Sequence, residues 1–227
     1  MIRSIRLLLP VVLLLPALAQ AASPGDILFA PPDLTRTTTL MQALADRASV
    51  REWSARELDR RDLGDLLWAA NGINRPAEHK YTAASAQNAH DIDLYCFFRD
   101  GIYRYDADSH ALRFVRAGDF RGELMLAPPA RPADSGVAAP PPPSAPPLQI
   151  MLVADTARFR FGPPELRPEW SAIDAGIVSQ NIALFCAAVG LTTRPRASMD
   201  KAKVRELLGL RDTQLVLLNH PVGYARE

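Results

Sequence analysis

The sequence has little cysteine and lacks the short motifs of several common enzyme classes. Two cysteines among 227 residues are too few for a disulfide-dense scaffold or a cysteine-rich metal module. The patterns Gly-x-Gly-x-x-Gly, Gly-x-x-x-x-Gly-Lys-Ser/Thr and Gly-x-Ser-x-Gly do not occur, which argues against a Rossmann dinucleotide site, a phosphate loop and a serine-hydrolase site. The histidines lack metal-ligand spacing, so we predict no metal site and an ordinary polar or turn role for each: His79, His90, His110 and His220.

An excess of charge of either sign is also missing. The 26 Lys and Arg residues nearly balance the 25 Asp and Glu residues, and the net charge is +1. A protein that binds nucleic acid by neutralising phosphates carries a larger positive excess, so we expect no nucleic-acid partner. The 48% hydrophobic and 22% charged residues are ordinary for a globular protein, and they exclude a chain that is disordered throughout.

The first 21 residues have the pattern of a secretory signal peptide. Arg3 and Arg6 precede an apolar run over 7–18, and the small residues Ala19 and Ala21 follow it. The run is shorter than the roughly 20 apolar residues that a membrane-spanning helix needs. We therefore predict cleavage after Ala21 and a periplasmic or secreted protein. No later segment reads as apolar enough for a membrane span, so we expect no stable membrane anchor.

The chain after this leader divides into an extended lead-in over 22–39 and a domain over 40–227. Apolar spacing predicts a helix over 40–48 at the start of the domain. A second helix follows, which Asp59 caps and Gly72 ends.

Three short strands are then expected. Residues of the first strand alternate between two faces, and an Asp-Gly pair makes a tight turn after it. Its Cys96, like Cys186 further along, lies in an apolar run, so we predict two buried free thiols rather than a disulfide. The strands form an antiparallel meander over 92–98, 102–105 and 111–115.

A proline-rich insertion over 122–147 separates the two halves of the domain. Nine of the 20 prolines fall within 128–147, which excludes a helix or a central strand there. We interpret the segment as a stiff, extended surface excursion, with a docking peptide for an aromatic groove as the alternative.

The second half of the domain contains a long, nearly all-apolar helix. We expect it to begin at Ser171, with Asp174 as its capping-box partner, and to end at Gly190. The mixed order of helices and antiparallel strands predicts an α+β fold, in which helices pack on an antiparallel-rich central sheet. The remaining elements are a strand over 149–154, a helix capped by Ser198 and closed by Gly209, and a strand over 215–218.

Two polar segments combine residue types that suit a ligand. Arg47, Ser49 and Arg51 alternate, so an extended backbone puts them on one side, where two guanidinium groups and a hydroxyl can bind a phosphate. A solvated helix end is the alternative interpretation. The second segment has small residues that let a ligand approach the backbone, although an ordinary loop explains it equally well. Its polar side chains are Ser85, Gln87 and Asn88.

Six stretches of the sequence are informative when their order and spacing are considered together. They are Arg-x-Ser-x-Arg-x-aromatic at 47–53, Leu-Leu-Trp-Ala-Ala-Asn-Gly-Ile-Asn-Arg-Pro at 66–76, Ser-Ala-Gln-Asn at 85–88, Gly-Ile-Tyr-Arg-Tyr-Asp at 101–106, the helix residues 174–191, and Pro-Val-Gly-Tyr at 221–224. In order and spacing, this set resembles the nitroreductase family, and within it the branch with SagB-type dehydrogenases. The resemblance implies a nitroreductase-like fold, usually a homodimer with FMN at each subunit interface.

The resemblance also implies roles for the polar segments. Arg47 and Ser49 would hold the FMN phosphate, and Arg51 would face the pyrimidine edge or the ribityl chain. A cation at that edge stabilises the negative charge of a reduced flavin. Because the flavin carries the chemistry in this family, we name no catalytic side chain. The second flavin-contacting loop of the family is matched by Ser85, Gln87 and Asn88.

Two features depart from the family pattern. The family has a helical cover where 122–147 is proline-rich. Its basic tail segment is reduced here to Arg226, and Arg194 and Arg196 are the basic residues that could replace it. Nicotinamides are not expected outside the cytoplasm, so the electron donor stays open. Two hypotheses follow: an exported FMN-dependent oxidoreductase acting on a small-molecule substrate, or a catalytically degenerate flavin-binding or interaction module.

Overall fold

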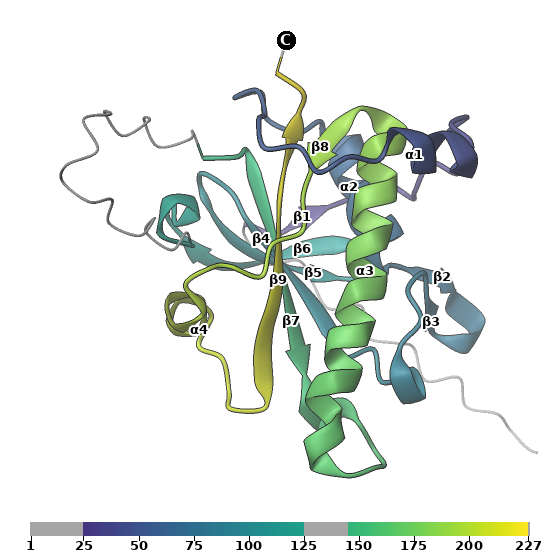
Figure 1. Cartoon of the computed structure of the whole chain (residues 1–227). Helices are drawn as coiled ribbons and strands as arrows, with labels where there is room; N and C mark the ends of the chain where they lie inside the picture. The colour runs from purple at the N-terminus through teal and green to yellow at the C-terminus, as the bar shows by residue number, and fades with distance from the viewer. Residues whose placement is uncertain (1–24, 125–144, 227) are drawn as a thin grey trace, which may run out of the picture.

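The computed structural model describes residues 25–124 and 145–226, so the predicted signal peptide and most of the proline-rich insertion lie outside it. Within these ranges, seven strands form one antiparallel sheet in the order β1-β6-β5-β4-β7-β9-β8 (Figure 1). The strands are β1 Ile27–Leu28, β4 Ile92–Phe97, β5 Gly101–Asp106, β6 Ala111–Ala117, β7 Leu148–Asp155, β8 Leu191–Thr193 and β9 Gln214–Tyr224, and β2 Ile73–Arg75 pairs separately with β3 Lys80–Tyr81. The predicted α+β class is confirmed.

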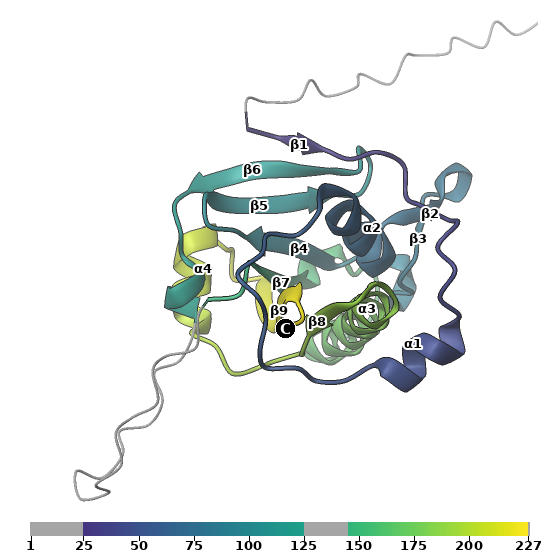
Figure 2. The ribbon, with the colours of Figure 1, turned by 90° about the horizontal axis from the view of Figure 1, so that it is seen from above.

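Helices cover both faces of the sheet. Seen from above, α2 and α3 lie over one face, α4 lies over the other, and α1 lies beside α3 (Figure 2). Each face therefore has its own apolar core. The alternating residues of β4 serve both: Leu94 and Cys96 point into one core, and Tyr95 and Phe97 into the other. The helices are α1 Leu40–Asp46, α2 Arg60–Asn71, α3 Arg167–Val189 and α4 Lys201–Leu208.

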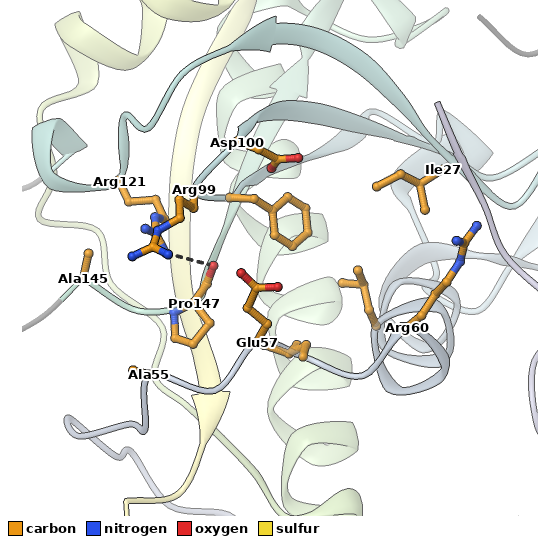
Figure 3. A pocket seen from close by; sticks show the side chains of 12 residues that line it. Ile27, Ala55, Glu57, Arg60, Arg99, Asp100, Arg121, Ala145 and Pro147 are labelled. Atoms are coloured by element: carbon orange, nitrogen blue, oxygen red, sulfur yellow. Dashed lines mark hydrogen bonds between the residues drawn. The ribbon is translucent and has the colours of Figure 1, made fainter. Parts of the chain in front are cut away.

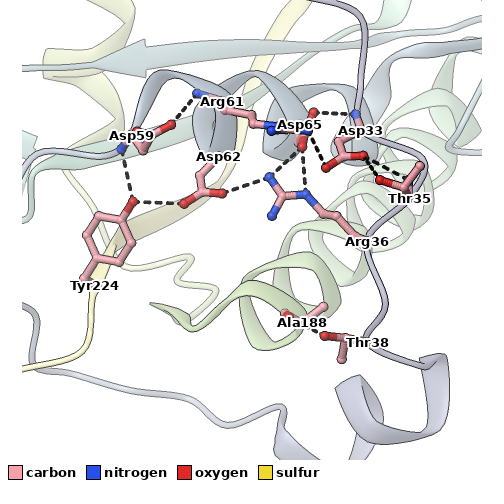
Figure 4. Close-up of polar contacts among 10 residues, drawn as sticks. All are labelled: Asp33, Thr35, Arg36, Thr38, Asp59, Arg61, Asp62, Asp65, Ala188 and Tyr224. Carbon is pink, nitrogen blue, oxygen red and sulfur yellow. Dashed lines mark hydrogen bonds and ion pairs between the residues drawn. The ribbon is translucent and has the colours of Figure 1, made fainter.

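The lead-in to the domain is tied to it by charged side chains. β1 adds an edge strand beside β6, and the residues after it run across α2. Arg36 donates hydrogen bonds to Asp65 at 2.7 Å and to Asp62 at 2.9 Å, while Arg61 donates to Asp33 at 2.6 Å (Figure 4). These pairs fix an extended segment that has no packed core of its own.

Helix α2 begins and ends where the sequence predicts. The Asp59 carboxylate accepts a hydrogen bond from the Arg61 amide at 2.7 Å, which satisfies one of the free amides of the first turn. Gly72 follows the last helical residue with a φ of −87°, so it does not need left-handed freedom. Its role is close approach, because a Cβ there would collide with the Trp68 side chain.

Two predicted helix starts are wrong. Helix α3 begins at Arg167, four residues before Ser171, because Pro168 fits the first turn of a helix, where its missing amide costs nothing. Ser171 is instead buried within the helix. Helix α4 is capped by Asp200, which accepts from the Lys203 amide at 2.9 Å, rather than by Ser198. The predicted ends are confirmed, since Gly190 and Gly209 both adopt left-handed φ values.

Helix α3 departs from the expectation that no segment after residue 21 is apolar enough for a membrane span. An 18-residue window within residues 164–189 has a mean hydropathy of 1.6, which is long and apolar enough for a membrane span. The helix nevertheless packs against α1, α2 and several strands of the sheet, as the core helix of a folded domain does. Its Cys186, like Cys96 on β4, is a buried free thiol, as predicted. Burial raises the pKa of both thiols.

Candidate functional site

The predicted phosphate-binding segment leaves the end of α1 and runs beside β8. Ser49 forms a parallel bridge with Thr193, and the Val50 amide donates to the Thr193 carbonyl at 3.1 Å. The alternation of Arg47, Ser49 and Arg51 is therefore displayed on extended backbone, and all three residues are exposed in the single chain.

The aromatic residue that closes this motif packs against the last predicted motif of the chain. Trp53 is buried, and the Ser54 amide donates to the Tyr224 carbonyl at 2.9 Å. A Cβ on Gly223 would lie 2.9 Å from the Trp53 Cβ and 3.0 Å from the Pro147 ring. Only glycine permits this contact, which explains why the two motifs belong together.

A buried polar cluster supports the strand that carries the segment. Thr193 donates its hydroxyl proton to the Pro221 carbonyl at 2.8 Å, so it accepts from Nδ1 of His220 at 3.1 Å. Nε2 of His220 then accepts from the Ser179 hydroxyl at 2.8 Å. Burial lowers the pKa of His220 to about 3, so its ring is neutral. This matches the ordinary polar role predicted for it.

Arg194 directly follows β8 and adds a further positive side chain beside the Arg47–Arg51 segment. Burial, together with the charge of Arg51, lowers the pKa of Arg194. Burial and the charge of Arg194 in turn lower the pKa of Arg196. Within the described part of the chain, no carboxylate forms an ion pair with Arg47, Arg51 or Arg194. The result is a positive cluster whose charge no ion pair among the described residues neutralises.

The second predicted segment is a strained loop before β4. Gln87, Asn88 and His90 all adopt left-handed φ values near 50°, which non-glycine residues reach only when their surroundings hold them. The Ser85 hydroxyl accepts from the His90 amide at 3.0 Å. The Gln87 side chain bonds both the amide and the carbonyl of Phe161, at 3.1 and 3.0 Å. Ser85 and Gln87 therefore shape the loop, and Asn88 is exposed on it.

Asp174, predicted as a capping-box partner, lies instead in a buried pair of carboxyl groups that anchors this loop to α3. Both Asp174 oxygens accept from the Ala86 amide, at 2.8 and 3.1 Å. Burial and the adjacent Asp91 carboxyl raise the pKa of Asp174 to about 7. Asp91 is fully buried and receives no donor from any described residue. A proton held by one of the two acids reduces the repulsion between them, because two bare carboxylates close together would repel.

The two predicted segments do not meet within one chain. The Ser85–Asn88 loop is attached near the start of α3 through Asp174. The Arg47–Arg51 segment lies beside β8, which follows the end of α3 at Gly190. Sixteen helical residues separate these points, a distance of about 24 Å at 1.5 Å per residue. Within one chain the two predicted segments are therefore apart, and we call each a half-site of the predicted ligand site.

A cavity of about 690 Å³ lies elsewhere in the described part of the chain. Its lining includes the apolar residues Leu58, Leu63 and Phe98. Charged residues such as Glu57 and Asp100 also line it (Figure 3). None of the six predicted ligand residues contributes to it. A smaller polar cavity of about 230 Å³ includes Asp93 and Arg158, which neutralise each other at 2.7 Å.

Comparisons with known proteins agree with this architecture. Residues 44–224 match the model of the nitroreductase family. The crystal structure of a candidate nitroreductase from Ralstonia eutropha has a TM-score of 0.77 and 32% identity, covering 91% of this chain and 93% of that one. A candidate nitroreductase of Methanocaldococcus jannaschii is 27% identical over 192 residues, 81% of this chain and 90% of its own length.

A more distant structure shares the fold alone. The microcin synthetase McbBCD complex of Escherichia coli, with truncated pro-microcin B17 bound, contains a chain with a TM-score of 0.64 and 16% identity. That match covers 99% of this chain and 85% of the other.

Proposed function

Because the chain belongs to the nitroreductase family, we propose that it is an FMN-dependent oxidoreductase acting on a small molecule. The observation that carries the proposal is the unneutralised positive segment at Arg47, Ser49 and Arg51. Arginines that a protein leaves without acidic partners favour an anionic ligand. When bound, FMN supplies the redox chemistry, taking up electrons from a donor and passing them to an acceptor.

The residues present fit the phosphate end of FMN. Arg47 and Ser49 offer a guanidinium group and a hydroxyl on the same side of an extended strand, which suits a dianionic phosphate. The bridge to Thr193 and the neutral His220 behind it keep that strand rigid. Arg51 lies two residues after Ser49. There it would orient the rest of the nucleotide and face the pyrimidine edge of the flavin ring.

We propose further that the active form is a homodimer built on α3. The outer face of this helix carries Ile173, which is 56% exposed, and Ile177, with Gly176 between them. A Cβ on Gly176 would meet nothing within 4 Å in the chain, so a small residue there leaves room for an approaching helix. Met41 on the neighbouring α1 is 74% exposed and extends the apolar area.

This dimer would also complete the ligand site. The half-sites lie at opposite ends of α3, so a two-fold axis across the middle of α3 would bring each Arg47–Arg51 segment toward the partner's Ser85–Asn88 loop. The loop would add neutral donors and acceptors, among them the Asn88 side chain, to the positive segment. FMN binding and dimer formation are then linked.

The proposal is tested by purifying the protein and following flavin absorbance. One FMN per chain, bleached anaerobically by NADH, NADPH or another donor and recovered with an acceptor, supports an oxidoreductase. Bound FMN that no donor or acceptor turns over supports the alternative, a catalytically degenerate flavin-binding module. Protein that neither contains FMN nor takes it up contradicts both.

The dimer has its own test in sedimentation velocity. Replacing Ile173 with Glu places a charge in the proposed interface, where its desolvation is unfavourable, and we expect a monomer with weakened FMN binding. Val115→Glu on β6 is the matched control, since Val115 is 40% exposed and lies away from α3. A wild-type protein that sediments as a monomer when saturated with FMN contradicts the dimer.

Export is a separate proposal that depends on residues 1–21. The basic start, the apolar run and the Ala-Gln-Ala sequence favour secretion to the periplasm or beyond. The mass of the protein from its native host, compared with that of the full chain, tests cleavage after Ala21. An uncleaved protein confined to the cytoplasm contradicts the proposal and would make nicotinamides the expected donors.

A further inference from the structure

Arg194 lies beside Arg51 through the geometry of two backbone segments. Because Ser49 pairs in parallel with Thr193, the chain two residues beyond Ser49 runs next to the residues that follow β8. Arg51 thus comes alongside the turn that begins at Arg194. The charge of Arg51 lowers the pKa of Arg194, although the two residues are 143 positions apart in sequence.

The surroundings of Arg194 leave part of its hydrogen-bonding capacity unused. Its side chain is partly buried, and its Nε atom is buried without an acceptor among the described residues. A buried donor without a partner is unfavourable. Placing it next to a second cation, when neither forms an ion pair with a described carboxylate, is more unfavourable still. The arrangement is accounted for if an anion occupies the space between the two side chains.

We propose that Arg51 and Arg194 form a two-guanidinium site for an anionic group of the flavin nucleotide. This inference rests on the proposed function and adds a residue to it that comes from the β8–α4 connection. FMN has two sources of negative charge: the phosphate, which is always charged, and the pyrimidine edge of the ring, which gains charge on reduction. Both would be bound by the same fork-like donors.

Two comparisons separate these sources in the Arg194→Ala protein. If the pair binds the phosphate, affinity for FMN falls about tenfold or more while affinity for riboflavin, which has no phosphate, is unchanged. If the pair binds the ring, reduced flavin loses more affinity than oxidised flavin, and the midpoint potential becomes more negative. A tenfold difference between the two redox forms corresponds to about 30 mV for a two-electron couple.

Controls distinguish loss of the anion site from loss of the fold. Arg194→Gln keeps hydrogen-bond donors without the charge and should behave like the alanine variant, whereas Arg194→Lys should recover part of the lost affinity. Arg104→Ala removes an exposed arginine on β5 and should leave binding and potential as in the wild type. Thermal unfolding without flavin should be unchanged, or shifted upward as the repulsion with Arg51 is removed.

The result that overturns the inference is specific. If wild-type protein binds FMN but the Arg194→Ala and Arg194→Gln proteins have the same affinities for FMN and riboflavin, and the same midpoint potential, Arg51 and Arg194 do not form the site. Wild-type protein that binds no flavin overturns the proposed function instead. The two failures are therefore distinguishable in one set of titrations.

Discussion

The arginines of this protein fall into two regions with opposite electrostatics. Across α2, Arg36 and Arg61 are bound to the carboxylates of Asp65, Asp62 and Asp33 (Figure 4). Beside β8, the arginines of the candidate site have no acidic partner within the described ranges. The first arrangement holds the lead-in to the domain, and the second leaves positive charge available for a ligand.

The pKa directions express the same contrast. Burial opposes the charge of Arg36, but hydrogen bonds to Asp65 and Asp62 outweigh it and raise the pKa. Burial likewise opposes the charge of Arg194, and there Arg51 adds repulsion, so the pKa is lowered. A guanidinium remains charged near neutral pH in both cases. Ion pairs with carboxylates therefore stabilise the fold across α2. Beside β8, the arginines of the candidate site form no such pairs among the described residues.

The largest expected effect comes from breaking a pair in the first region. Arg36→Met keeps apolar contact with the Phe185 ring but leaves the buried Asp65 carboxylate without its cation. We expect a loss of about 3 kcal/mol in the free energy of unfolding, measured by urea denaturation. Arg51→Met in the second region should cost little stability, and equal losses in both variants would contradict the comparison.

The next largest effect is expected on ligand binding in the second region, beside β8. Arg47→Ala should weaken FMN binding by about 1.5–3 kcal/mol, the scale of a charged hydrogen bond, while riboflavin binding stays the same. Fluorescence titration of the flavin-free protein measures both affinities. The unfolding free energy should stay within about 0.5 kcal/mol of wild type, as for other exposed positions. Unchanged FMN affinity would reject the assignment of Arg47 to the phosphate.

A third prediction concerns the acid pair beneath the second half-site. The pKa of Asp174 is about 7 in the folded chain, against 3.8 for an ordinary aspartate. The folded state therefore binds more protons between these values, so stability is full below pH 3.8 and is lost as the pH rises through 7. The slope reaches at most about 1.4 kcal/mol per pH unit for one proton.

The Asp91→Asn variant tests directly whether this acid pair causes the pH dependence of stability. The asparagine can donate to Asp174 without sharing a proton, so the decline in stability between pH 3.8 and about 7 should be reduced. Thermal unfolding at several pH values measures the change. A variant with the full wild-type pH dependence would show that other groups cause it.

The smallest expected effect is at the start of α2. Asp59→Ala removes the acceptor for the Arg61 amide, and loss of such a cap costs about 1 kcal/mol. Because Asp59 caps α2 and lies outside the proposed FMN site, the affinity for FMN should be unaffected. Denaturant unfolding and a flavin titration on the same sample check both parts. A drop in FMN affinity would mean that the two regions are coupled.

Local patterns predicted much of the fold. The capping residue Asp59 and the alternation along β4 were read from neighbouring residues, and the structure agrees. The wrong predictions concern helix starts, where a nearby residue begins or caps the helix in place of the serine that was predicted. Ser171 has the chemistry of a cap, but Pro168 starts the helix earlier, and Asp200 is better placed than Ser198.

The candidate site was harder to predict because it depends on tertiary contacts. Arg47, Ser49 and Arg51 form a recognisable pattern over five residues. The proximity of Arg51 to Arg194 depends on the bridge between Ser49 and Thr193, which no local spacing reveals. The contact of Asp91 with Asp174 likewise joins a loop to a helix more than 80 positions away. The sequence pattern therefore suggested a capping-box role for Asp174 and gave no signal for Asp91.

The central claim is that the positive segment after α1 binds the phosphate of a flavin nucleotide. Its most direct test is a titration of flavin-free wild-type protein with FMN and, in parallel, with riboflavin. We predict one FMN per chain, with riboflavin bound at least tenfold more weakly because the phosphate contacts are missing. Absence of FMN binding, or equal affinity for the two flavins, would contradict the claim.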